Sequence, residues 1–358
     1  MIAAVFGTTG ELIKLAPVLA RIRARGGSYV GVTTAQQVSQ LPPLLDLIGL
    51  PQPDVWLARG RAGRDLRTTA DIPPWLGRVA VTAARTAPGL RRRLGDGGLV
   101  LVHGDTMTTV VGAMLGRALR LPVAHLEAGI RTFDLRHPFP EEANRRIVTR
   151  LASIHYAPGE PEAANLGRGR DAVVTPGNTI RDSLALCEPR ELPGVEPPFG
   201  LVSLHRFELL RDAELLRRTL ETLRAASRRL PLLFVDHPVT VAAVDRFGLD
   251  RLFGGGLRRI PRLDFFTFVA LLRQADFLVT DSGGSQAECW LLDKPCLVHR
   301  KVVDHREGLG ETTVVSGLRV ETLAAFLREP GRHRRRAPLP PESPSDVVVD
   351  DLARRGYL

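Results

Sequence analysis

Short apolar runs alternate with amphipathic segments from the first residues of the chain. Residues 2–6 form an apolar run typical of a buried strand, and a turn at 7–10 that contains two glycines follows it. Apolar side chains then return at helical spacing within residues 11–24, at Leu12, Leu15, Val18, Leu19 and Ile22. The pattern predicts a strand, a turn and a helix.

The same order recurs downstream. Ile72-Pro73-Pro74 predicts a loop among the early elements. Further strands are predicted at 99–103, 121–126, 153–157, 200–204, 232–235, 277–280 and 296–299, and helices at 109–119 and 346–355. Strands that alternate with helices form parallel sheets, whose functional residues gather at the carboxyl ends of the strands. The fold class predicted is therefore α/β.

Two proline-rich segments, at 188–199 and 337–344, divide this pattern. We expect an N-terminal Rossmann-like domain at 1–185 and a C-terminal Rossmann-like domain at 186–340. A final helix within 341–358 is expected to pack back on the N-terminal domain. Two doubly wound domains that face each other leave a cleft, and ligands often bind in such clefts.

Composition and charge exclude some classes of protein. The 358 residues are 44% hydrophobic and 25% charged, as in ordinary globular proteins. The net charge is +10, but the basic residues are scattered and aromatic residues make up only 5%, which disfavours nucleic-acid binding. No apolar run approaches the roughly 20 residues that span a bilayer. The N-terminus does not resemble a signal peptide, and the three cysteines are expected to be reduced, so we expect a cytoplasmic protein.

A segment at 280–288 (TDSGGSQAE) has the pattern of a diphosphate site. It lies between a predicted strand and a predicted helix, so its backbone N–H groups and the positive helix end would face an anion. Gly283 and Gly284 allow a phosphate to approach the backbone, and Ser282 adds a hydroxyl donor. Glu288, about one turn later, is placed to accept from a ribose diol.

Carboxylates follow two predicted strands of the N-terminal domain. Asp105 comes after the strand at 99–103 and Glu127 after the strand at 121–126, and Glu141 arrives on a loop. Neighbouring parallel strands lie roughly 5 Å apart, so these side chains can share one end of the sheet. Carboxylates clustered in this way acquire different pKa values and can supply an acid and a base.

Structural explanations for the same residues stay open at this point. Asp105 could cap the helix that follows it, and either Glu141 or Glu142 could pair with Arg145 or Arg146 on its own helix. His103 and His125, two residues before Asp105 and Glu127, also give the group some likeness to a metal cluster. We nevertheless expect no metal and no cofactor.

Taken together, the motifs resemble the non-hydrolysing UDP-N-acetylglucosamine 2-epimerase family. The resemblance runs from the first strand to about residue 318. It is carried by VHGDTMTTVVGAMLG (102–116), AHLEAGIRTFD (124–134), PEEANR (140–145), TPGNTIRDSL (175–184) and TDSGGSQAE (280–288). It implies the GT-B arrangement of two Rossmann-like domains with a cleft between them, a UDP-sugar substrate and a homodimer.

The resemblance also implies roles for individual residues. Asp105, Glu127 and Glu141 match the catalytic carboxylates of the family, and His205 matches a signature histidine near the diphosphate. Residues implied to contact UDP or the sugar are Lys14, Arg131, Arg206, His237, Ser282, Gly283, Gly284 and Glu288.

Several positions depart from the family pattern. Thr9 stands where the family usually has an arginine, and Gln36-Gln37 stands where a Gln-His pair is usual. The segment 304–307 and Phe207, after His205-Arg206, differ as well. These changes suggest an altered sugar preference, and they make activation by substrate at an allosteric site doubtful.

The expected activity is interconversion of UDP-N-acetylglucosamine and UDP-N-acetylmannosamine through elimination and re-addition of UDP. The alternatives are a hydrolysing epimerase that releases UDP and N-acetylmannosamine, a GT-B glycosyltransferase, and a nucleotide-sugar-binding protein without catalysis. Three intact carboxylates argue against the last of these.

Overall fold

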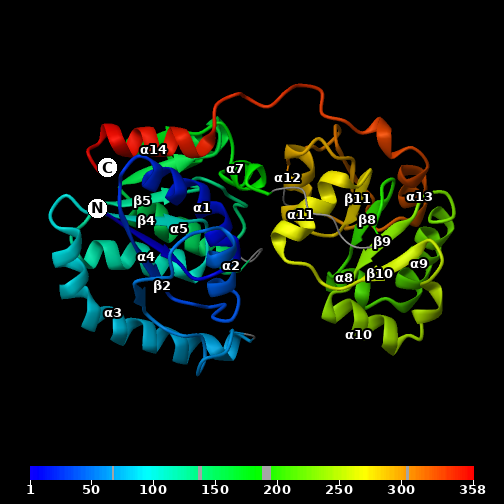
Figure 1. The fold of residues 1–358 in the computed structure, drawn as a ribbon, viewed down its shortest axis with the longest axis horizontal. Helices are drawn as coiled ribbons and strands as arrows, with labels where there is room; N and C mark the ends of the chain where they lie inside the picture. Colours follow the sequence, from blue (N-terminus) through cyan, green and yellow to red (C-terminus); the bar gives the residue numbers. More distant parts are fainter. Residues whose placement is uncertain (67, 136–138, 188–194, 304–305) are drawn as a thin grey trace. The chain divides into compact units, whose positions relative to one another are not determined.

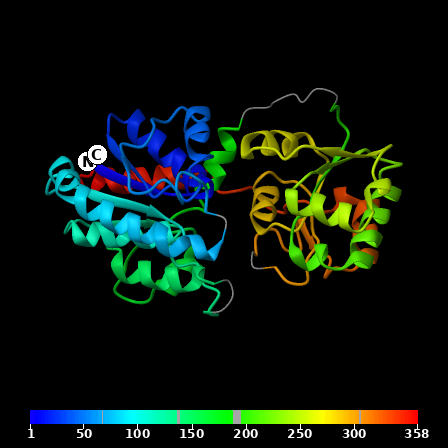
Figure 2. The same cartoon turned by 90° about the horizontal axis from the view of Figure 1, so that it is seen from below.

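A computed structural model describes residues 1–66, 68–135, 139–187, 195–303 and 306–358. The chain divides into two compact units (Figures 1 and 2). The first consists of Met1–Ser183 together with Pro340–Leu358, and the second of Leu184–Leu339. The chain therefore leaves the first unit once and returns to it at its end.

The first unit contains a seven-stranded parallel sheet in the order β3-β2-β1-β4-β5-β6-β7. The strands are β1 (Ile2–Phe6), β2 (Tyr29–Thr33), β3 (Val55–Trp56), β4 (Leu99–His103), β5 (Val123–Leu126), β6 (Ile154–Ala157) and β7 (Asp171–Val174). The helices are α1 (Thr9–Ala24), α2 (Leu41–Leu47), α3 (Ile72–Leu94), α4 (Met107–Ala118), α5 (Glu141–Leu151), α6 (Glu160–Leu166) and α14 (Pro344–Arg354), with α7 (Ile180–Ala185) where the chain passes to the second unit.

Helices cover both faces of this sheet. Side chains of α3, α4 and α5, including Trp75, Ala113 and Val148, join Val5 and Val102 in one buried cluster. Helices α1 and α14 lie side by side, as Figure 1 shows. Buried residues of α14 are Val348, Val349 and Leu352.

The second unit contains a six-stranded parallel sheet in the order β10-β9-β8-β11-β12-β13. The strands are β8 (Gly200–Ser203), β9 (Leu232–Val235), β10 (Leu257–Ile260), β11 (Phe277–Thr280), β12 (Cys296–Val298) and β13 (Thr313–Val315). The helices are α8 (Phe207–Leu210), α9 (Ala213–Ala226), α10 (Pro238–Arg246), α11 (Phe265–Gln274), α12 (Gly283–Leu291) and α13 (Val320–Arg328). Two separate buried clusters, one containing Val202 and Leu220 and the other Leu201 and Leu271, lie on opposite faces of the sheet.

The prediction of two Rossmann-like α/β domains with parallel sheets is confirmed. The predicted loop at Ile72-Pro73-Pro74 is wrong, because these residues begin the 23-residue helix α3. Proline is tolerated in the first helical turn, where its missing N–H would have no intrahelical partner. The two prolines, which had predicted a loop, therefore mark the start of a helix.

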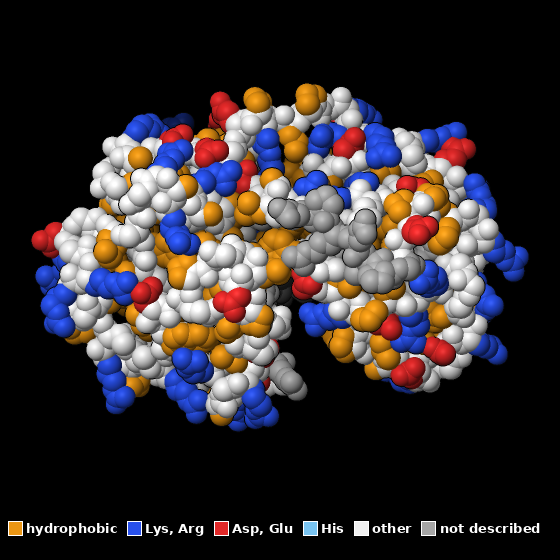
Figure 3. Space-filling model, viewed as in Figure 1, with side chains coloured by type: hydrophobic (Ala, Val, Ile, Leu, Met, Phe, Trp, Pro, Cys, Tyr) orange, Lys and Arg blue, Asp and Glu red, His pale blue; other side chains and the backbone are white. Residues whose placement is uncertain are grey.

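The surface carries many charges and also exposed large apolar side chains, among them Phe133, Phe139 and Val302. On the face shown in Figure 3, lysine and arginine side chains are dispersed among acidic and apolar ones. In the described part of the chain, no helix is both long enough and apolar enough to cross a membrane.

Candidate active site

In the first unit, two carboxylates lie at the carboxyl ends of neighbouring strands. His103 at the end of β4 pairs in register with Leu126 at the end of β5. Asp105 and Glu127 follow these two residues and therefore lie at the same edge of the sheet. Glu127 has a φ of 63°, an uncommon conformation for a residue other than glycine. A residue keeps such a strained backbone conformation only where the surrounding structure holds it in place.

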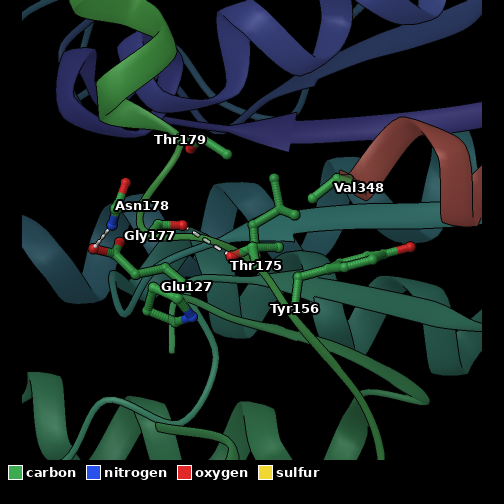
Figure 4. Close-up of a pocket in the computed structure, with 9 residues that line it drawn as sticks. Glu127, Tyr156, Thr175, Gly177, Asn178, Thr179 and Val348 are labelled. Carbon is green, nitrogen blue, oxygen red and sulfur yellow. Dashed lines mark hydrogen bonds between the residues drawn. The ribbon is translucent and has the colours of Figure 1, made fainter. Parts of the chain in front are cut away.

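Three polar side chains hold the Glu127 carboxylate. Lys14 Nζ of α1 donates to Oε1 at 2.7 Å and to Oε2 at 3.0 Å. Asn178 Nδ2 donates to Oε1 at 2.5 Å (Figure 4), and His103 Nδ1 lies 3.5 Å from Oε2. Burial alone would raise the pKa of Glu127, but Lys14, His103 and Asn178 together lower it to about 2. Glu127 is therefore ionised throughout the neutral range.

Figure 4 shows the small pocket into which this group faces. The pocket lies within the first unit, and its lining is drawn from the ends of β5 and β6, the segment 175–179 and helix α14. The lining residues are Leu126, Glu127, Tyr156, Pro158, Thr175, Gly177, Asn178, Thr179 and Val348. Asn178 also accepts from Ile180 N through Oδ1, which fixes its amide donor toward Glu127.

Asp105 is held by arginine and does not cap a helix. Thr106, one residue later, is the N-cap of α4 and accepts from the backbone of Thr108 and Thr109. The capping explanation for Asp105 is therefore wrong. Its Oδ2 accepts from Arg145, with Nε at 2.9 Å and Nη2 at 2.6 Å.

Glu141 and Glu142, the first two residues of α5, have different surroundings. Glu142 is fully buried, its Oε1 is 2.9 Å from Arg146 Nε, and its Oε2 accepts from Thr132 N. Glu141 Oε2 is buried without a hydrogen-bond partner among the described residues. A buried carboxylate oxygen without a partner is costly in a finished structure, so Glu141 is the member of the pair available to a ligand. Arg131, predicted to contact the substrate, donates to Thr149 of α5 at 2.7 Å.

The two histidines of this edge are neutral. Burial lowers the pKa of His103 to about 3 and that of His125 to about 4. His125 Nε2 lies 2.8 Å from Gly104 O, so the ring is hydrogen-bonded to the backbone of the turn after β4. Among the described residues, no group of three or more His, Cys, Asp or Glu side chains is placed to hold a metal ion.

The turn between β1 and α1 is closed to anions. Glu11 Oε2 accepts from Gly7 N and Thr8 N, both at 2.9 Å, so a carboxylate occupies the N–H groups that a phosphate would need. Thr9 donates through N and Oγ1 to Gln37 Oε1, at 2.7 and 2.9 Å. Two positions that depart from the family pattern, Thr9 and Gln37, therefore bind each other.

The turn between β11 and α12 in the second unit is built differently. Ser282 is the N-cap of α12 and accepts from Ser285 N at 3.5 Å. Gly284 is exposed, and a Cβ added there would meet only Ser282 Oγ, at 3.8 Å. Neither packing nor a positive φ requires glycine at this position, and the backbone here is open to close approach by a ligand. Glu288 lies one turn further along the same helix.

Two more predicted residues lie at the same edge of the second sheet. His205 follows β8 and His237 follows β9, and their ring centroids are 4.5 Å apart. His237 Nε2 lies 3.1 Å from Ser203 Oγ. Burial, with nearby Arg262 contributing to both, lowers the pKa of each histidine to about 4. Arg206, also predicted, begins the short helix α8 as its N-cap.

Sequence reasoning missed three residues that hold the predicted ones. Asn178 binds Glu127, Arg145 binds Asp105, and Asp281 binds the backbone at His205. Asp281 was visible as an acidic residue directly after a buried strand, the same signal that identified Asp105 and Glu127. The segment 304–307, singled out for its departures, lies partly outside the described residues, since 304–305 are not among them.

The chain is similar in sequence to known proteins over most of its length. A family model described as UDP-N-acetylglucosamine 2-epimerase matches residues 88–326. A probable UDP-N-acetylglucosamine 2-epimerase of Ralstonia nicotianae is 35% identical over 334 residues, covering 87% of this chain and 84% of the relative. The UDP-N-acetylglucosamine 2-epimerase of Yersinia pestis is 32% identical over 335 residues, covering 87% and 85%.

The fold agrees as well. The UDP-GlcNAc 2-epimerase of Methanocaldococcus jannaschii, solved in complex with UDP-GlcNAc and UDP, has a TM-score of 0.76 to this chain. The two are 26% identical, and the match covers 99% of each chain.

Proposed function

The chain belongs to the UDP-N-acetylglucosamine 2-epimerase family, and from this premise we propose that it interconverts UDP-N-acetylglucosamine and UDP-N-acetylmannosamine without releasing the free sugar. The observation that carries the proposal is the pair of fixed carboxylates at one sheet edge, Glu127 held by Lys14 and Asn178 and Asp105 held by Arg145. Inversion at a carbon requires proton transfer on both faces, and two separately held carboxylates meet that requirement.

The order of bond changes follows from the chemistry of the sugar. The C2 hydrogen of an N-acetylhexosamine has no adjacent carbonyl, so direct removal at neutral pH is implausible. In the proposed first step the C1–O bond breaks, UDP leaves with the electron pair, and positive charge develops at C1. The C2 proton is then acidic enough for a carboxylate to remove, which yields a 2-acetamidoglucal.

Re-addition reverses these steps on the other face. The carboxyl group that took the C2 proton releases it to solvent, and the opposite carboxylate takes up a proton from solvent. That second group then protonates C2 from its own side, and a UDP oxygen attacks C1 to restore the glycosidic bond. We assign proton transfer at C2 to Asp105 and Glu127, and we assign Glu141, whose Oε2 lacks a protein partner in the described part of the chain, to assisting or holding the sugar. A positioned acid or base contributes about 10²–10⁴-fold to the rate.

The contrast between the two βα turns supports placing the diphosphate on the second unit. The β1–α1 turn is filled by Glu11, whereas Ser282, Gly283 and Gly284 offer a helix N-terminus with room for an anion. His205, Arg206 and His237 lie at the same edge of that sheet and are proposed to stabilise the departing UDP, with Glu288 binding the ribose.

Product analysis tests the proposal. Incubation with UDP-N-acetylglucosamine, followed by proton NMR, should show UDP-N-acetylmannosamine accumulating to an equilibrium mixture. UDP and free N-acetylmannosamine as the products would instead identify a hydrolysing member of the family. Unchanged substrate at high enzyme concentration would refute both.

A further inference from the structure

The C-terminal end of α12 is bound by an arginine that lies far away in the sequence. Residues 331–336 read GRHRRR, and arginine side chains are mostly exposed in proteins. Arg335 is nevertheless half-buried, and its Nη1 donates to Trp290 O at 2.8 Å and to Leu291 O at 3.1 Å. These two carbonyl groups belong to the last two residues of α12. The basic run therefore supplies a cation to the negative end of this helix.

The hydrogen bonds of Arg335 complete this end of the helix. The last four carbonyl groups of an α-helix have no partner within the helix. In α12 the first two of them, Glu288 O and Cys289 O, accept from backbone N–H groups of the residues directly after the helix, at 3.0 and 2.8 Å. The other two are the carbonyl groups that Arg335 contacts.

The turn after α12 holds Arg335 in place. Asp293 has a φ of 53°, the left-handed conformation that commonly ends a helix, and its Oδ1 accepts from Arg335 N at 2.7 Å. Arg335 Nε donates to Ala337 O at 2.9 Å, and Arg334 Nη1 donates to Asp293 O at 2.7 Å. Both the backbone and the side chain of Arg335 are thus fixed, so its guanidinium is not a mobile surface charge.

Glu288 lies in the turn of α12 that Arg335 binds. The helix has only nine residues, and Glu288 is two residues before Trp290. Without the bonds to Arg335 this last turn would be free to fray, and Glu288 would move with it. We propose that Arg335 is a positioning residue, which holds the last turn of α12 so that the Glu288 carboxylate meets the ribose diol of the nucleotide. The ribose contact rests on the proposed function, whereas the bonds between Arg335 and α12 depend on the protein alone.

The ribose diol can be removed from the ligand, which allows a direct test by calorimetry on the full-length protein. UDP and 2′,3′-dideoxyuridine 5′-diphosphate share the base and the diphosphate and differ only in two hydroxyl groups. The wild type should bind UDP at least about tenfold more tightly, because hydrogen bonds to a charged group are strong. Glu288→Ala should bind the two ligands about equally, which gives the ratio expected when the ribose contact is lost.

Arg335→Met removes the guanidinium and keeps an unbranched side chain. A residue that acts on a ligand through its neighbours typically changes the affinity by about 2- to 30-fold, and UDP affinity should fall within this range. Affinity for the dideoxy analogue should stay at the wild-type value, because the proposed diphosphate contacts lie at the other end of α12. Arg332→Met is the matched control: Arg332 belongs to the same basic run, but its side chain is 76% exposed and binds Glu329, so both affinities should stay unchanged.

Asp293→Gly is a second variant that keeps the test open if Arg335→Met does not fold. Glycine suits the φ of 53° at this position, and the loss of the carboxylate releases Arg335 N. This variant should also lose part of its preference for UDP over the dideoxy analogue. A folded Arg335→Met or Asp293→Gly protein that keeps the full wild-type preference would overturn the proposal.

The remaining outcomes separate this role from general damage and from the proposed reaction. Equal losses of affinity for UDP and for the analogue in Arg335→Met would show a purely structural role and would overturn the proposal. A wild type without any preference for UDP would overturn it together with the ribose role of Glu288. A wild type that shows the preference but epimerises no substrate would refute the proposed reaction and leave the role of Arg335 standing.

Discussion

At the scale of single residues, the candidate site depends on partners that are distant in sequence. Asp105 and Glu127 were predictable because each comes shortly after a buried strand, a pattern visible within about six residues. Their partners were not, because Lys14 lies 113 residues from Glu127, Arg145 lies 40 from Asp105, and Asp281 lies 76 from His205. Such pairings arise only once the strands are ordered in the sheet.

Glu127 is expected to be essential for turnover and dispensable for nucleotide binding. Glu127→Gln removes the charge and the proton-transfer group, and we expect kcat to fall by roughly 10²–10⁴-fold. UDP affinity measured by calorimetry should be nearly unchanged, because the proposed UDP contacts belong to the second unit. Glu142→Gln removes a carboxylate that is bound to Arg146, and this variant is the control for a loss of activity that comes from a damaged structure. Near-normal turnover in Glu127→Gln would remove Glu127 from the mechanism.

The pH dependence tests the role of Lys14. The folded pKa of Glu127, about 2, is below its ordinary value of 4.5, so the carboxylate stays ionised until the pH falls through about 2. Lys14→Met removes the nearest cation and should raise this pKa, so that kcat/KM falls between about pH 6 and 4. Lys14→Arg keeps the charge and should preserve the wild-type profile over that range. Identical profiles for Lys14→Met and the wild type would contradict the account.

At the scale of elements, the central strands were predicted well and the sheet edges were not. The predictions for β4, β9 and β11 coincide with the observed strands. The edge strands β7 and β10 escaped prediction because β7 has only four residues and is mostly exposed, and β10 contains Arg258 and Arg259. An edge strand has one hydrogen-bonded neighbour and a partly solvated face, so it needs no apolar run.

The two βα turns should respond differently to the same substitution. Gly284→Ala meets no side chain closer than 3.8 Å, and alanine in a helix is favourable by up to about 1 kcal/mol, so thermal stability should be kept or improved. UDP affinity should fall at least about tenfold, or 1.4 kcal/mol, because the added methyl group blocks the diphosphate. Gly10→Ala in α1, where a Cβ meets nothing within 4 Å, is the matched control and should bind UDP normally. Equal affinities for the two variants would place the diphosphate elsewhere.

At the scale of the whole molecule, the last nineteen residues belong to the unit that begins the chain. Asp351 Oδ2 accepts from Tyr156 OH at 2.9 Å, and Asp182 Oδ2 accepts from Ser345 N at 2.8 Å. The sequence indicated a final helix from its spacing. The partners that hold it became visible only in the structure, because they lie 195 and 163 residues away.

Removal of residues 340–358 should therefore unfold the first unit selectively. Val348, Val349 and Leu352 are fully buried, and each contributes about 1.5–3 kcal/mol, which together approaches the total stability of a typical domain. Hydrogen exchange with mass spectrometry should show protection lost within 1–183 and kept within 184–339. Removal of 356–358 alone should change little, since these residues follow the end of α14. Equal loss in both units would show that they do not fold separately.

The central claim is that the C2 proton is removed and returned by carboxylates on the two faces of the sugar. Incubation with UDP-N-acetylglucosamine in D₂O measures this directly, because a proton taken by a carboxylate exchanges with solvent before it returns. The account predicts deuterium at C2 of the UDP-N-acetylmannosamine formed and, over time, of the remaining substrate. Conversion of the substrate with hydrogen fully retained at C2 would contradict it.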